Sequence, residues 1–210
     1  MSFFDNNKTV GLALIIVGLI TLIVGIGNAV AGVVDSSNTN NAKIAAICFG
    51  IAALIFGILI FGYGFKVRGG PNDQSDIVSG LIRMVGVATI LQALFNAVGA
   101  YFSNADSSSI GASVWAAIAS MIVSIIIGLI LIWAAGKVAG HGKNVISKIL
   151  WIILVVVFLV LAILTLVHAF PIGSGIMGIL VLISAICMFF VYLYCFIAML
   201  SKDVKSTMGI

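Results

Sequence analysis

Long apolar runs, separated by short polar or glycine-rich connections, make up most of this sequence. A helix needs about 20 apolar residues to cross the roughly 30 Å core of a bilayer. Six runs meet this requirement, near Val10–Val34, Ile44–Phe65, Ile77–Phe102, Ala112–Ala139, Val145–Phe170 and Gly175–Leu200. The strands of a membrane barrel would alternate in polarity, whereas these runs are apolar on every face. The sequence therefore predicts an all-α integral membrane bundle of six transmembrane helices, in one membrane domain over residues 1–210.

The runs pair into what we interpret as three copies of one helical hairpin, over residues 1–70, 71–142 and 143–210. The tripeptide Asn-Ala-Val begins at Asn28 and again at Asn96, each time before a serine- and asparagine-rich connection. The first two units also both end in a Lys-Val step. The third unit resembles them less closely, with His168 at the place of the two asparagines.

Composition and charge support a membrane location. Of the 210 residues, 63% are hydrophobic and 8% are charged, which is too little charge to cover a soluble domain of this size. The mean hydropathy is +1.34. Of the 10 Lys and Arg residues, only Lys43 falls in a connection on the side opposite the others. The positive-inside rule therefore predicts a multi-pass protein of the cell membrane with both termini in the cytoplasm. The net charge of +4 would meet anionic lipid headgroups, and we expect no nucleic-acid partner.

Small residues recur at intervals of seven in the first three predicted helices. The set comprises Gly11, Gly18, Gly25 and Gly32, then Gly50, Gly57 and Gly64, and then Gly86 within the series Ser79, Gly86, Ala93 and Ala100. This spacing keeps one face of a helix against a left-handed neighbour, and small side chains let membrane helices approach closely. The fourth run uses a four-residue spacing instead, in Ala116, Ser120, Ser124 and Gly128. We interpret the glycines as helix-packing residues; the alternative is a flexible gating helix.

Few polar side chains lie within the spans, and four of them are informative: Asn28, Gln92, Asn96 and His168. Asn28, Asn96 and His168 occupy equivalent places in the three hairpins, so they are candidates for a polar ring at the mouth of a central cavity. The alternative is that each side chain bonds a neighbouring helix or caps its own span.

The motifs of several enzyme and transporter classes are absent. The Gly173-Ser174-Gly175 stretch resembles the serine loop of an intramembrane protease, but no histidine follows it to activate the nucleophile. The three cysteines have no metal-ligand spacing, so we expect no metal and no cofactor. The proline signature of mitochondrial carriers, the Asn-Pro-Ala pair of aquaporins and the potassium-channel filter are missing as well. We expect the chain not to be an enzyme.

Two functions remain open. The first is a structural or accessory membrane protein, a subunit of a homo- or hetero-oligomeric complex. The second is a channel or transporter for a small neutral or weakly polar solute. Transporters often break helices near the midplane with Gly or Pro, whereas Pro71 and Pro171 both lie at span ends. This observation favours the first function.

Overall fold

Six long helices and one short helix make up the described part of the chain. The structure, a computed structural model, describes residues 6–70, 73–105, 110–140, 145–169 and 175–210. The helices are α1 (Asn7–Val34), α2 (Asn40–Gly69), α3 (Gln74–Asn104), α4 (Ile110–Ala139), α5 (Val145–Ala169), α6 (Gly175–Met199) and α7 (Lys202–Met208). The six long helices are long and apolar enough to cross a membrane, and their bounds lie within a few residues of the predicted spans. This confirms the predicted all-α fold and describes a multi-pass membrane protein.

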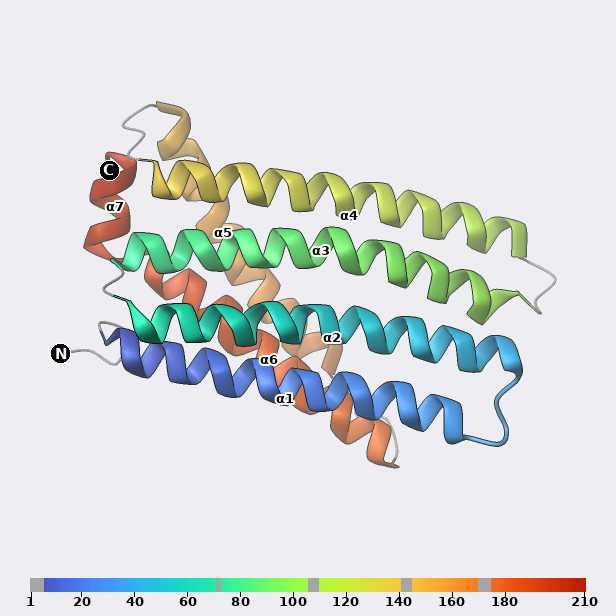
Figure 1. Cartoon of the computed structure of the whole chain (residues 1–210). Coiled ribbons are helices and arrows are strands. Elements are labelled where there is room, and N and C mark those ends of the chain that lie inside the picture. The colour runs from blue at the N-terminus through green and yellow to red at the C-terminus, as the bar shows by residue number, and fades with distance from the viewer. Residues whose placement is uncertain (1–5, 71–72, 106–109, 141–144, 170–174) are drawn as a thin grey trace.

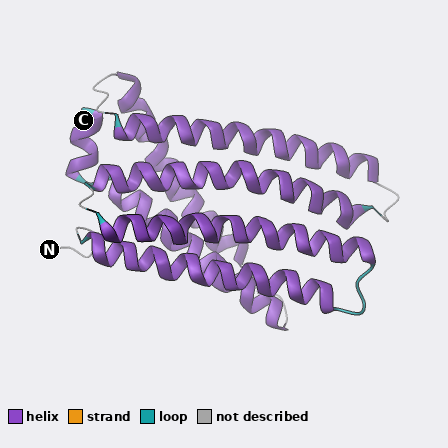
Figure 2. Cartoon of the chain, in the orientation of Figure 1, coloured by secondary structure: helices purple, strands orange, loops and turns teal. Residues whose placement is uncertain are grey.

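The first four helices lie side by side in one layer (Figure 1). Each of them contacts the next along the chain: α1 with α2, α2 with α3, and α3 with α4. Helices α5 and α6 form a second layer that crosses the first at a slant. Figure 2 shows that nearly all of the described chain is helical. The α5–α6 hairpin is therefore placed differently from the two hairpins that share the first layer.

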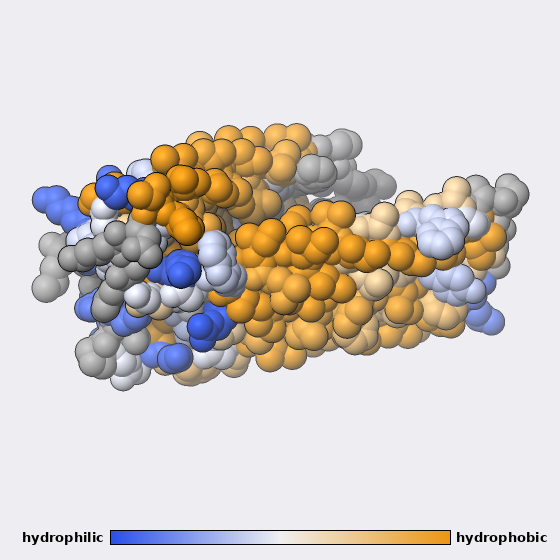
Figure 3. All heavy atoms as spheres, turned by 90° about the horizontal axis from the view of Figure 1, so that it is seen from above, coloured by the Kyte–Doolittle hydropathy of each residue, from blue (hydrophilic) through white to orange (hydrophobic). Residues whose placement is uncertain are grey.

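The two described chain ends lie at the same end of the bundle, which we call the basic end (Figure 1). Lys66 and Arg68 lie in the last turn of α2, Lys137 in the last turn of α4, and Lys205 in α7. Figure 3 shows hydrophilic residues gathered at this end and an apolar belt beside them. Cations suit the carboxyl ends of helices because the helix dipole is negative there.

The buried core is concentrated toward the basic end. Its largest fully buried side chains include Phe56, Ile60, Ile77, Leu81, Phe158 and Met199. In this part of the molecule α6 contacts α1 and α3, so the bundle is two layers deep. The halves of α3 and α4 that lie away from the basic end, which we call their far halves, extend beyond the second layer (Figures 1 and 3). We call this end of the bundle the far end. Half of this hairpin therefore has neighbours only within its own layer.

The short helix α7 crosses the basic end, where it contacts α3, α4, α5 and α6. The Ser201 hydroxyl caps it by accepting a hydrogen bond from the Val204 backbone N–H at 3.3 Å. Val204 and Met208 are fully buried, and Gly209 ends the helix with a φ of 76°, in the left-handed region that favours glycine. The sequence predicts no helix here, because two apolar residues among charged and polar ones give a weak signal.

The connection between α1 and α2 is held by side chains that bond the backbone. The Asn38 amide donates to the Gly32 carbonyl at 2.8 Å, and the Thr39 hydroxyl caps α2. The Asp35 carboxylate accepts hydrogen bonds from the hydroxyl and the backbone N–H of Ser37. These bonds favour the ionised form and lower the pKa of Asp35.

Candidate functional site: a polar groove between α3 and α4

The contact between α1 and α2, which we call the first seam, is lined by glycines from both helices. They are Gly11, Gly18, Gly25 and Gly32 from α1 and Gly50, Gly57 and Gly64 from α2. A Cβ atom added to Gly57 would lie 2.9 Å from the Leu22 backbone nitrogen, and one added to Gly64 would lie 2.7 Å from that of Ile15. The Cβ position of Gly57 also lies 3.1 Å from the Gly18 carbonyl oxygen. Larger residues therefore do not fit unless the two helix backbones move apart.

The contact between α3 and α4, which we call the second seam, is equally close at only one place. A Cβ atom added to Gly86 would lie 2.8 Å from the Gly128 carbonyl oxygen, and one added to Gly128 would lie 2.7 Å from that of Gly86. Nearer the basic end, the Ser79 hydroxyl donates to the Ala135 carbonyl at 2.9 Å. Toward the far end the α3 series continues with Ala93 rather than with another glycine.

A groove of about 480 Å³ opens along the far half of the second seam. Its walls come from α3 and α4, and Phe49 of α2 forms one edge. Its polar lining residues are Thr89, Gln92, Asn96, Ser120 and Ser124. We call this feature the seam groove. It exists because small side chains line this stretch and leave space that the first seam does not have.

The seam groove faces the side of the layer that α5 and α6 cover nearer the basic end. Asn96 follows the buried Val85 by eleven residues, which is about three helical turns, so the two side chains lie on the same side of α3. Helix α6 contacts α3, but the second layer ends before the far halves of α3 and α4. The groove is therefore the uncovered continuation of a face that is buried elsewhere.

The polar groups of the seam groove fall into two kinds. The Gln92 amide donates to the Ala52 carbonyl of α2 at 2.8 Å, and the Thr89 hydroxyl donates to the Val85 carbonyl of its own helix at 2.8 Å. These two side chains are satisfied by protein. The side chains of Asn96, Ser120 and Ser124 make no hydrogen bond with other described residues, and Asn96 and Ser120 are exposed. The groove thus offers one amide and two hydroxyls at membrane depth.

Two members of the predicted polar ring, Asn28 and Asn96, lie on different pairs of helices. Asn96 lines the seam groove, whereas Asn28 lies on α1 and does not line it. The Asn28 side-chain oxygen is buried and accepts no hydrogen bond from the described residues. The side chain of His168 lies outside the described part of the chain. Helix α2 lies between α1 and α3. A ring shared by all three side chains stays a prediction, because the His168 side chain is not described.

The sequence pointed to Asn96 and Gln92 as polar candidates and to Ser120 and Ser124 as packing residues, but it did not bring the two sets together. The spacing within each set carried a further signal. Thr89, Gln92 and Asn96 recur at three and four residues, and Ser120 and Ser124 at four, so each set lies on one face of its helix.

Among the residues that the structure describes, no group of three or more His, Cys, Asp or Glu side chains could hold a metal ion. Comparison with protein-family models, with curated proteins and with solved structures found no match. The seam groove is therefore interpreted from its own chemistry.

Proposed function

We propose that this protein is a structural or accessory subunit of a membrane complex, and that it assembles through the seam groove. The observation that carries the proposal is the exposure of Asn96 and Ser120 in a groove at membrane depth. Lipid tails offer no hydrogen bonds, so a polar side chain in the hydrocarbon region is favoured only where it meets another polar group. A helix from a second copy or from another chain would supply that group.

Helix α4 has the surface that such an assembly needs. It buries the smallest share of its span, 11%, against 50% for α3. Ser120 and Ser124 lie one turn apart on it, and small residues at this spacing let a neighbouring helix approach closely. The proposed orientation, with the basic end in the cytoplasm, follows from the distribution of Lys and Arg and places the seam groove in the outer leaflet.

The proposal is tested by measuring the native mass of the full-length protein after mild extraction. We expect a discrete oligomer or a complex of fixed stoichiometry. The double variant Asn96→Leu/Ser120→Leu should shift it toward the monomer. Membrane hydrogen bonds contribute about 0.6 to 2 kcal/mol each, so the loss of two should weaken assembly by about 10-fold or more.

Thr165→Val is the matched control, because the Thr165 hydroxyl donates to the Leu161 carbonyl of its own helix and not to a groove. A monomeric wild type in native nanodiscs would contradict the proposal. So would a double variant that assembles as well as Thr165→Val.

A second function, a channel or transporter for a small weakly polar solute, draws support from the same groove, since about 480 Å³ lined by amide and hydroxyl groups could hold such a solute. The arrangement of α1–α4 in a layer rather than a ring makes it the less favoured proposal. Solute flux into liposomes distinguishes the two. Flux through a monomer that falls in Asn96→Leu would support the transporter.

A further inference from the structure

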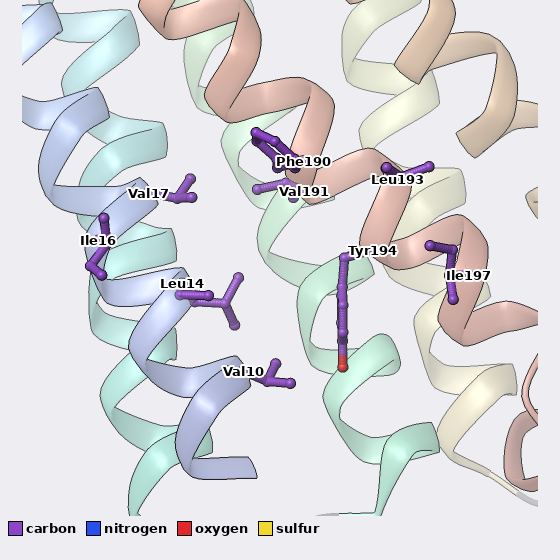
Figure 4. Close-up of a pocket in the computed structure, with 10 residues that line it drawn as sticks. Val10, Leu14, Ile16, Val17, Phe190, Val191, Leu193, Tyr194 and Ile197 are labelled. Carbon is purple, nitrogen blue, oxygen red and sulfur yellow. The ribbon is translucent and has the colours of Figure 1, made fainter. Parts of the chain in front are cut away.

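A second cavity lies at the basic end, between α1 and α6 (Figure 4). This slot has a volume of about 430 Å³ and is lined by ten residues, of which Tyr194 alone carries a polar side-chain group. Along α1 it runs from Val10 to Val17, which is about 10 Å at 1.5 Å per residue. It is thus separate from the seam groove in position and in chemistry.

The slot has a buried floor and an open rim. Val10 and Val191 on the floor are each only 2% exposed, whereas Ile16 and Phe190 on the rim are 48% and 55% exposed. An opening of this kind admits a flexible apolar chain from the side. In a bilayer, the apolar chains on that side are the acyl chains of lipids.

Two basic residues, Lys8 and Arg68, lie at the end of the bundle where the slot ends at Val10. Lys8 precedes Val10 by two residues, and the Arg68 backbone packs on Gly11, where an added Cβ atom would lie 2.5 Å from the Arg68 nitrogen. Both side chains are exposed, and neither pairs with an acidic side chain in the described ranges. Tyr194 points its hydroxyl toward this same end of the slot (Figure 4).

We infer that the α1–α6 slot binds one acyl chain of an anionic phospholipid, with the lipid phosphate held near Lys8 and Arg68. The apolar lining and the exposed basic residues at this end of the bundle match the two parts of such a lipid. A second copy of this chain is the poorer occupant, because it would bring the same cations against the same end of the slot. This inference stands independently of the seam groove and of assembly.

The test is native mass spectrometry of the full-length protein from nanodiscs of phosphatidylglycerol and, separately, of phosphatidylcholine. We expect phosphatidylglycerol to remain bound after detergent exchange and phosphatidylcholine to be lost. Each cation near a membrane surface contributes about a fivefold change in affinity, so Lys8→Gln/Arg68→Gln should weaken phosphatidylglycerol retention by about 20- to 30-fold. Lys43→Gln is the control, since Lys43 lies near the start of α2, at the far end.

A second variant addresses the slot itself. Ala13→Phe places a ring among the lining residues and should abolish retention of phosphatidylglycerol although Lys8 and Arg68 are unchanged. Equal retention of the two lipids would overturn the inference, and so would a Lys8→Gln/Arg68→Gln protein that behaves like Lys43→Gln. If Ala13→Phe does not fold, the two charge variants still decide the outcome. Dimers in place of bound lipid that Ala13→Phe disrupts and Asn96→Leu/Ser120→Leu leaves intact would overturn the inference and assign the slot to a second copy.

Discussion

Small residues recur at the same seven-residue spacing in the first and second seams. The helix backbones approach closely along the first seam, whereas a groove separates them along part of the second. When Asn28 is aligned with Asn96, Gly11, Gly18 and Gly25 of the first seam fall on Ser79, Gly86 and Ala93 of the second. The one position that is glycine in both, Gly18 and Gly86, contacts the backbone of the facing helix in each.

The differences between the seams begin where glycine is replaced. The second seam has Ala93 at the position that corresponds to Gly25. At this position the space between α3 and α4 forms the polar seam groove. A single methyl group is enough to matter, because two helix backbones in van der Waals contact leave no room for a Cβ atom. The first hairpin is therefore closed along its length, whereas the second exposes polar groups that a partner helix can reach.

The largest expected effect comes from adding a side chain at a glycine of the first seam, where the two helices leave no space for one. In Gly18→Leu the new Cβ atom would contact the Phe61 backbone nitrogen, and backbone cannot rotate away as a side chain can. We expect a loss of about 3 kcal/mol or more in the free energy of unfolding, measured by reversible unfolding in detergent micelles. The control is Gly62→Leu on α2, because a Cβ atom at Gly62 has nothing within 4 Å. Equal stability of the two variants would show that glycine is not needed at the first seam.

A smaller effect compares aligned positions in the two seams. In Gly25→Leu the added Cβ atom would lie 3.1 Å from the Leu54 backbone nitrogen, so the helices must give way by a small amount. We expect a loss of about 1 to 3 kcal/mol. Ala93→Leu should cost less than about 1 kcal/mol, because the larger side chain can enter the seam groove. The free energy of unfolding of both variants is measured in the same way. If Ala93→Leu loses as much of it as Gly25→Leu does, the seam groove has no room for the larger side chain.

The spans could be predicted from the sequence because length and apolarity alone decide whether a helix can cross a bilayer. The seven-residue spacing of Gly11, Gly18 and Gly25 likewise pointed to a contact face, and these residues lie where α1 meets α2. The slant of α5 and α6 could not be predicted. Helices that are apolar all round carry no signal for which side meets lipid and which meets protein.

The seam groove was only partly predictable for a related reason. Asn96 stood out because amides are rare within the spans, but its grouping with Ser120 and Ser124 depends on the pairing of α3 with α4. Helix α7 escaped prediction because its seven residues bury only Val204 and Met208. Its signal was local: Ser201 as a cap, two apolar residues one turn apart, and Gly209 after the last turn.

The most direct test of assembly through the seam groove is photo-crosslinking in native membranes. A photoreactive amino acid placed at Ser120 should form one discrete protein adduct, either with a second copy or with one other subunit. Placed at Ile122, which lies at the same depth on another side of α4 and is 50% exposed, it should label lipid. A protein adduct at Ser120 and none at Ile122 is the predicted result. Labelling of lipid alone at both positions would contradict the proposed role of the groove.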